Sequence, residues 1–194
     1  MAKQKLIFSL FGYAILIYLW FELPFNLYEP TRAFHLPTLL WLTHLFILYI
    51  HEAGHFFFRF LGEDFYILGG SIMQVLVPFV WLIVARREES ALAPVAAFFT
   101  GLSLVDVSIY VRDAETQILP LLGGHHSKHD WATFLGKHDM LDWAVPLGNL
   151  FYFSGLLISL GAIAWGINLS YRLYQQARLE ASLPSSGKGP ADQT

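Results

Sequence analysis

Residues 36–61 read LPTLLWLTHLFILYIHEAGHFFFRFL, a long apolar run that carries two histidines and a glutamate in its second half. About 20 predominantly apolar residues are needed to cross the hydrocarbon core of a bilayer as a helix. Four further apolar runs lie near residues 6–21, 65–85, 90–111 and 144–171. The pattern predicts an all-α integral membrane protein with about five transmembrane helices.

The composition of the whole chain favours the same class. Of the 194 residues, 55% are hydrophobic and only 14% are charged, whereas a soluble domain carries about 25% charged residues. A soluble globular protein is therefore excluded. The net charge is -3 and the basic residues are scattered, so we expect the lipid bilayer and no nucleic acid as a partner. Cysteine is absent, which leaves His, Asp and Glu as metal ligands.

One polytopic membrane domain is predicted over residues 1–171, followed by a polar, disordered tail over 172–194. The connections between the spans are short except for 112–143, which holds four of the eight histidines. Its tryptophans and charges are typical of the membrane interface, so we interpret it as an interfacial loop. With five spans, the 12 Lys and Arg residues divide six to six between the two sides, which gives no orientation.

An HExxH motif, His51-Glu52-Ala53-Gly54-His55, lies inside the second predicted span. Two imidazoles at positions i and i+4 of a helix share one face and reach one zinc ion. Glu52 lies about 100° round the helix, where it can act as general base on a metal-bound water. An acidic residue at mid-membrane costs about 3 kcal/mol, and bound zinc can offset this with about 10 kcal/mol or more. A zinc site is therefore favoured over a hydrogen-bonded polar patch.

A catalytic zinc usually has three protein ligands, and depth in the membrane selects the candidate for the third. If the second and fourth spans run in the same direction, Asp106 lies at the depth of the two histidines. A buried carboxylate bonded to a neighbouring Ser or Tyr is the competing interpretation of Asp106. Asp113, lower on the same helix, and Asp130, in the interfacial loop, are the alternative third ligands.

Three further polar residues are candidates to support the metal without binding it: His44, Tyr110 and His129. His44 lies seven residues before His51, about 10 Å away along a helix, and cannot share the ion. A hydrogen bond from His44 to a backbone carbonyl or to Thr43 is its preferred interpretation. A strand-like run over 65–68 precedes Gly69-Gly70, which allows a close backbone approach, an exposed extended edge or a turn.

Residues 36–113 resemble the site-2 protease family of intramembrane zinc metalloproteases, as a divergent, minimal member. The resemblance rests on the HExGH helix, the short stretch ending in Gly69-Gly70, and two further spans of which the last carries an aspartate. It implies that His51 and His55 bind zinc, that Glu52 activates water, and that a membrane-spanning helix is the substrate. The family's usual Asp-Gly pair is absent, so Asp106 and Asp113 compete for the third position.

The sequence thus predicts an intramembrane zinc metallopeptidase that hydrolyses peptide bonds of membrane-embedded substrates, with His51, His55 and Asp106 on the metal. One alternative is a non-catalytic membrane binding protein that retains a protease-like zinc fold. A less favoured alternative is a metal carrier supplied by the histidine-rich loop. The histidines of that loop are His125, His126, His129 and His138.

Overall fold

The computed structural model describes residues 2–120 and 129–182, and all regular secondary structure in them is helical. This confirms the all-α prediction for these residues. In chain order the elements are α1 (Ala2–Asn26), α2 (Thr38–Phe58), the 3-10 turn η1 (Arg59–Leu61), α3 (Glu63–Arg87), α4 (Ala93–Arg112), α5 (Asp130–Lys137), the 3-10 turn η3 (Leu141–Trp143) and α6 (Ala144–Ser182).

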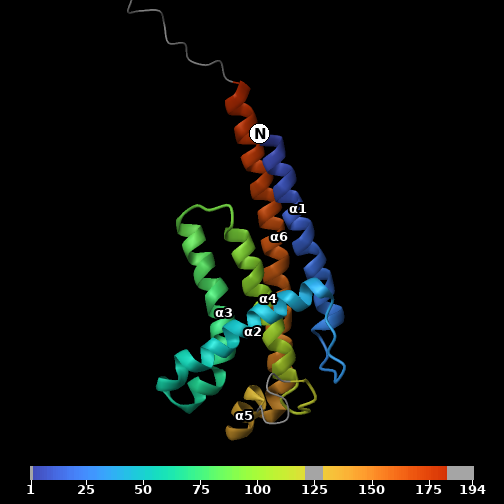
Figure 1. Ribbon diagram of the computed structural model, residues 1–194, viewed down its shortest axis with the longest axis vertical. Helices are drawn as coiled ribbons and strands as arrows, with labels where there is room; N and C mark the ends of the chain where they lie inside the picture. The colour runs from blue at the N-terminus through green and yellow to red at the C-terminus, as the bar shows by residue number, and fades with distance from the viewer. Residues whose placement is uncertain (1, 121–128, 183–194) are drawn as a thin grey trace, which may run out of the picture.

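Four of these helices, α1, α3, α4 and α6, are long and apolar enough to cross a membrane. They run along the long axis of the molecule in the spatial order α1, α6, α4, α3, whereas α2 runs obliquely across them (Figure 1). The sequence predicts five spans, and the second of them, 36–61, is not among the four. The histidines and the glutamate of α2 interrupt its apolar run.

Helix α4 forms the core of the bundle. Of its apolar segment 78% is buried, against 22% for α1 and 33% each for α3 and α6. It packs most closely against α6, where Gly101 faces Gly155. A Cβ on Gly101 would lie 2.6 Å from the Gly155 carbonyl oxygen, and a Cβ on Gly155 would lie 2.5 Å from the Gly101 carbonyl oxygen. Small residues thus bring the two backbones into contact, as is common between membrane helices.

We expect Gly155→Ala to destabilise the bundle by about 1–3 kcal/mol, because the added methyl group overpacks the contact with α4. Gly161→Ala is the matched control on the same helix, since no described atom lies within 4 Å of a Cβ there. Alanine is the better helix former by about 1 kcal/mol, so the control should be neutral or slightly stabilising. Thermal unfolding of the detergent-solubilised chain measures both variants, and equal stabilities would contradict the packing.

Three segments are more helical than the sequence predicts. The run 65–68, predicted to be strand-like, lies in the first turns of α3, so that prediction is wrong. Helix α3 begins at Glu63 after Gly62 (φ 108°), and the two acidic residues of its first turn complement the helix dipole. The predicted interfacial loop 112–143 contains α5.

The predicted disordered tail from residue 172 is also helical in its first part. Helix α6 continues to Ser182, because residues 172–182 are mostly strong helix formers such as Leu, Ala, Arg, Gln and Glu. The remainder of the tail, 183–194, lies outside the described residues.

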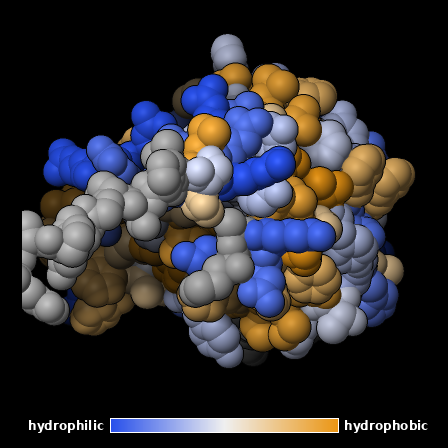
Figure 2. Space-filling model, turned by 90° about the horizontal axis from the view of Figure 1, so that it is seen from above, coloured by the Kyte–Doolittle hydropathy of each residue, from blue (hydrophilic) through white to orange (hydrophobic). Residues whose placement is uncertain are grey.

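Basic residues divide unequally between the two ends of the bundle. The end with the N-terminus and the α3–α4 connection carries six: Lys3, Lys5, Arg86, Arg87, Arg172 and Arg178. Figure 2 looks onto this end and shows hydrophilic side chains gathered among hydrophobic ones. Among the described residues, the other end carries four, of which Arg112 is buried: Arg32, Arg59, Arg112 and Lys137. Because Lys and Arg accumulate on the cytoplasmic side, we expect the first end to face the cytoplasm.

Cysteine labelling tests this orientation directly, because the chain has no cysteine of its own. Glu88→Cys and Glu115→Cys each replace an exposed glutamate. Glu88 lies in the α3–α4 connection, and Glu115 follows the other end of α4. In intact cells a membrane-impermeant maleimide should label Glu115→Cys and leave Glu88→Cys unlabelled until the cells are opened. The reverse pattern would place the α2–α5 end in the cytoplasm.

Candidate metal centre

Helix α2 crosses α3 at three glycines. A Cβ on Gly54 would overlap the Gly69 carbonyl group, and a Cβ on Gly69 would lie 2.8 Å from the Gly54 carbonyl oxygen. A Cβ on Gly70 would overlap the imidazole of His51. Of the three interpretations of Gly69-Gly70, the structure therefore has the close backbone approach. This approach lets the His51 ring lie directly over the backbone of α3.

The two histidines of the motif turn their Nε2 atoms toward a single carboxylate oxygen. Asp130 Oδ2 lies 3.0 Å from His51 Nε2 and 3.2 Å from His55 Nε2. Among the described residues, these three side chains are the group whose ligand atoms lie within 4.8 Å of one another. A tetrahedral zinc ion, with bonds of about 2.0–2.1 Å, separates its ligands by about 3.3 Å. The two distances from Asp130 Oδ2 are close to this separation.

The other ring nitrogens of the two histidines face atoms that only accept hydrogen bonds. His51 Nδ1 donates to Gln74 Oε1 at 2.7 Å, and His55 Nδ1 donates to the Tyr66 carbonyl oxygen at 2.8 Å. With the proton on Nδ1, each neutral ring presents an Nε2 lone pair to Asp130. Lone pairs and a carboxylate repel one another, so this arrangement requires protons or a cation between them. The donor set can therefore hold either protons or a metal cation.

Asp130 is brought to the histidines by α5, of which it is the first residue. The helix is anchored on α3, where Trp131 Nε1 donates to the buried Ser71 Oγ at 3.0 Å. At its other end, Lys137 Nζ lies 2.7 Å from carboxylate oxygens of Glu63 and Asp64. Burial alone would raise the pKa of Asp130, but when the two rings are protonated and donate from Nε2, their hydrogen bonds outweigh burial and hold that pKa below its ordinary value. Asp130 is thus an anion near neutral pH.

Neither Asp106 nor Asp113 is brought to the two histidines. Asp106 Oδ1 lies 2.6 Å from His44 Nδ1, and its Oδ2 accepts from Gln74 Nε2 at 3.1 Å. The depth argument that selects Asp106 assumes that α2 and α4 are parallel, whereas α2 crosses α4 obliquely (Figure 1). The structure therefore places the alternative, Asp130, where the sequence analysis expects Asp106.

Asp113 is fully buried and organises the chain that follows α4. Its Oδ1 accepts from Thr116 Oγ1 and from the Ile118 amide, both at 2.8 Å, and its Oδ2 accepts from the Leu119 amide at 3.0 Å. His129 Nδ1 lies 3.3 Å from the same Oδ2. Asp113 thus ties the start of α5, next to Asp130, to the end of α4.

The remaining predicted residues lie around the centre. Glu52 is exposed to a cavity of about 750 Å³ that the motif histidines and Asp130 also line. His44 bonds to Asp106 and not to Thr43, whose hydroxyl donates to the Leu39 carbonyl oxygen. Tyr110 Oη lies 3.4 Å from His44 Nε2. His138 Nε2 lies 3.1 Å from Asp64 Oδ2. Two further histidines of the loop, His125 and His126, lie outside the described residues.

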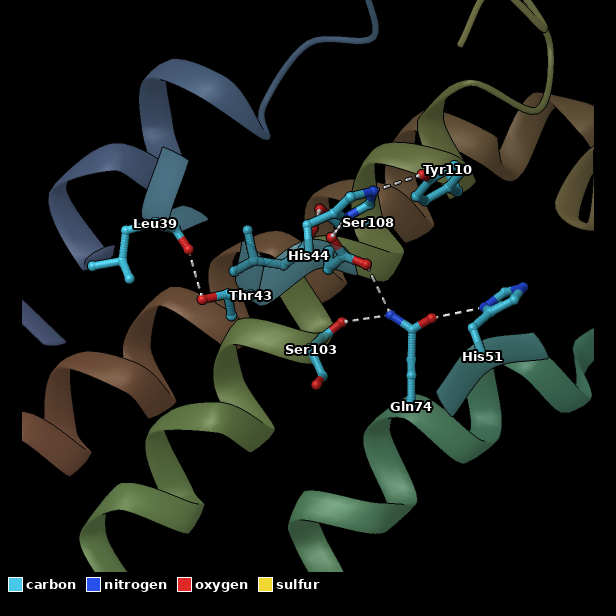
Figure 3. Close-up of polar contacts among 10 residues, drawn as sticks. Leu39, Thr43, His44, His51, Gln74, Ser103, Ser108 and Tyr110 are labelled. Carbon is cyan, nitrogen blue, oxygen red and sulfur yellow. Dashed lines mark hydrogen bonds and ion pairs between the residues drawn. The ribbon is translucent and has the colours of Figure 1, made fainter. Parts of the chain in front are cut away.

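Gln74 is the residue that the sequence analysis leaves out of the site. Its side chain reaches from α3 between His51 and the buried middle of α4, as Figure 3 shows. It is 3% exposed, in a helix that is otherwise apolar between Ile72 and Ala85. Burying a lone amide in an apolar span costs free energy unless the amide is hydrogen-bonded. A single glutamine in such a span is therefore the sequence signal for a buried polar contact. The Tyr66 carbonyl has no such signal, because any backbone could supply it.

No protein-family model, curated protein or solved structure matches this chain. The functional interpretation therefore depends on the chemistry of His51, His55, Asp130 and Glu52. These four side chains combine three groups that could hold a metal ion with one exposed carboxylate at the wall of a cavity.

We expect the purified chain to contain one zinc ion, and we expect His51→Ala and Asp130→Ala each to lose most of it, because each substitution removes one of three ligands. Asp142→Ala, which replaces an exposed aspartate of the same end, is the control that should keep its zinc. Elemental analysis of the detergent-purified variants measures the metal per chain. Equal zinc in Asp130→Ala and wild type would contradict this ligand set.

Proposed function

We propose that the chain is an intramembrane zinc metallopeptidase, of the kind that the site-2 protease family comprises. Its substrates would be membrane-embedded proteins. The observation that supports this best is the position of Glu52, which borders the cluster of His51, His55 and Asp130 in one cavity of about 750 Å³. A cluster that could hold a metal ion beside a carboxylate is what hydrolysis by a metal-activated water requires.

The ligand set suits a catalytic metal. Two imidazole nitrogens and one carboxylate oxygen are donors that zinc accepts, and three protein ligands are typical of catalytic zinc sites. Zinc bound there would lower the pKa of a water molecule and polarise the scissile carbonyl group. The protein must hold these side chains in place. Gln74 and the Tyr66 carbonyl do this for the two imidazoles.

Glu52 has the role of moving protons. In hydrolysis the water oxygen bonds to the carbonyl carbon, the carbon–nitrogen bond breaks, and the amine nitrogen must gain a proton. Glu52 follows His51 on the same helix and faces the cavity, so its carboxylate is placed to take a proton from the attacking water. It then gives that proton to the leaving amine.

The walls of the cavity favour an apolar substrate. Phe34, Trp41, Leu45 and Leu48 line it beside the polar cluster, and α2 exposes further apolar side chains where lipid would lie. A substrate carbonyl is hydrogen-bonded within a helix, so the substrate must unwind before it is cut. Residues 65–68 are helical and offer no free strand edge, so these apolar side chains are what would hold the unwound segment.

We expect Glu52→Gln to lower the rate of peptide cleavage about 10²- to 10⁴-fold, because the amide cannot take up a proton. It should keep its zinc, since Glu52 is not a ligand in this scheme. The assay uses quenched fluorescent peptides with an apolar, membrane-spanning sequence in lipid vesicles, and Glu115→Gln is the control at an exposed site. Wild-type cleavage by Glu52→Gln would contradict the mechanism. Binding of these peptides with no cleavage by the wild type would favour the non-catalytic binding protein.

A further inference from the structure

We propose that Asp106 is a positioning residue of the metal centre. It orients the side-chain amide of Gln74, and Gln74 in turn holds His51 in the tautomer that binds metal. The inference rests on the proposed function and deepens it, because it gives a task to a buried carboxylate that does not reach the cluster.

The contacts form a continuous chain from α2 through α4 and α3 back to α2. His44 Nδ1 lies 2.6 Å from Asp106 Oδ1, and Gln74 Nε2 donates to Asp106 Oδ2 at 3.1 Å. Gln74 Oε1 accepts from His51 Nδ1 at 2.7 Å. Figure 3 shows the Gln74 amide between its two sets of partners, with its nitrogen toward α4 and its oxygen toward His51.

The orientation of the amide follows from what its partners can donate. An ionised carboxylate and a carbonyl oxygen only accept hydrogen bonds. Both Asp106 Oδ2 and the Ser103 carbonyl oxygen, at 3.4 Å, face the Gln74 nitrogen. Since 3.4 Å is a long contact for a hydrogen bond, the carboxylate supplies most of the preference. The amide oxygen is then forced toward His51.

The orientation of the amide decides which nitrogen of His51 can bind metal. An amide oxygen at Nδ1 requires a proton on Nδ1 and leaves the Nε2 lone pair free, on the side of Asp130. A reversed amide would present its NH₂ group to Nδ1. The neutral ring would then carry its proton on Nε2, where it blocks the metal.

Burial makes the preference strong. His44 is 7% exposed, Gln74 is 3% exposed and Asp106 is 2% exposed, so water competes little for their hydrogen bonds. A buried carboxylate is costly unless it is hydrogen-bonded, and here its partners are an imidazole and an amide. These side chains serve the fold as well, which means that loss of stability alone cannot test the proposal.

The test measures the zinc dissociation constant of the full-length, detergent-solubilised chain by competition with a chromophoric chelator. We expect Asp106→Leu to weaken zinc binding by about 10- to 100-fold, the usual effect of losing an outer partner of a metal ligand. Ser108→Ala is the control, because Ser108 is buried on the same helix and its hydroxyl bonds to the Val105 carbonyl oxygen. Its zinc affinity should equal that of the wild type.

A double variant separates positioning from a structural role. In Gln74→Glu/Asp106→Leu, both oxygens of the new carboxylate accept hydrogen bonds. Either orientation of the carboxylate at position 74 therefore presents an acceptor to His51 Nδ1. Zinc affinity should return to near the wild-type value. In Gln74→Leu/Asp106→Leu it should stay low. Thermal unfolding of each variant confirms that the protein measured is folded.

The outcomes distinguish this inference from the function on which it rests. An unchanged zinc affinity in Asp106→Leu, or a loss that Gln74→Glu does not reverse, overturns the positioning role and leaves the proposed peptidase intact. A wild-type chain that binds no zinc overturns both.

Discussion

The backbone contact between Gly54 of α2 and Gly69 of α3 is the constraint on which the site depends. Because neither residue has a Cβ, α2 lies on α3 closely enough for the imidazole of His51 to cover Gly70. The same approach brings the Tyr66 carbonyl to His55 and the Gln74 amide to His51. A larger residue at either glycine would lift α2 away from both of these acceptors, and the two Nε2 atoms would lose their common direction.

The polar groups in this mostly apolar bundle are joined to one another, which is how their burial is tolerated. One set runs from His44 through Asp106 and Gln74 to His51. A second set centres on Asp113, which binds backbone amides beyond α4 and contacts His129. Both sets end at the candidate metal centre, the first at a histidine and the second at the residue before Asp130. The hydrogen bonds that satisfy these buried polar groups therefore also hold His51 and the start of α5 in place.

The all-α fold, four of the apolar helices and the histidine pair could be predicted from sequence, because each depends on local pattern. Apolar length and the i, i+4 spacing of His51 and His55 need no knowledge of tertiary packing. The third member of the cluster, Asp130, could not be selected in this way. Its choice depends on the angle at which α2 crosses the bundle, and that angle is set by the contact of Gly54 with α3. The carbonyl of Tyr66 is equally invisible in sequence, since every residue carries such an oxygen.

The pattern also misjudges segments whose helical structure comes from propensity or from docking. Residues 172–182 continue α6 because they are good helix formers, although their polarity suggests a tail. Helix α5 has only eight residues, too few to be stable alone in water. It is held by the hydrogen bond from Trp131 to Ser71 and by the ion pairs of Lys137 with Glu63 and Asp64 at the start of α3.

The position of Asp130 on this short docked helix couples two equilibria. The histidines belong to α2, while the carboxylate belongs to a helix whose attachment to α3 is made by a few side-chain contacts. A cation held by all three side chains would bind only when α5 is docked on α3. Such a cation would stabilise the docked state of α5, and docking would raise the affinity for the cation by the same free energy. Substitutions on the surface of α5, outside the cluster of His51, His55 and Asp130, would therefore change the affinity of any metal ion bound there.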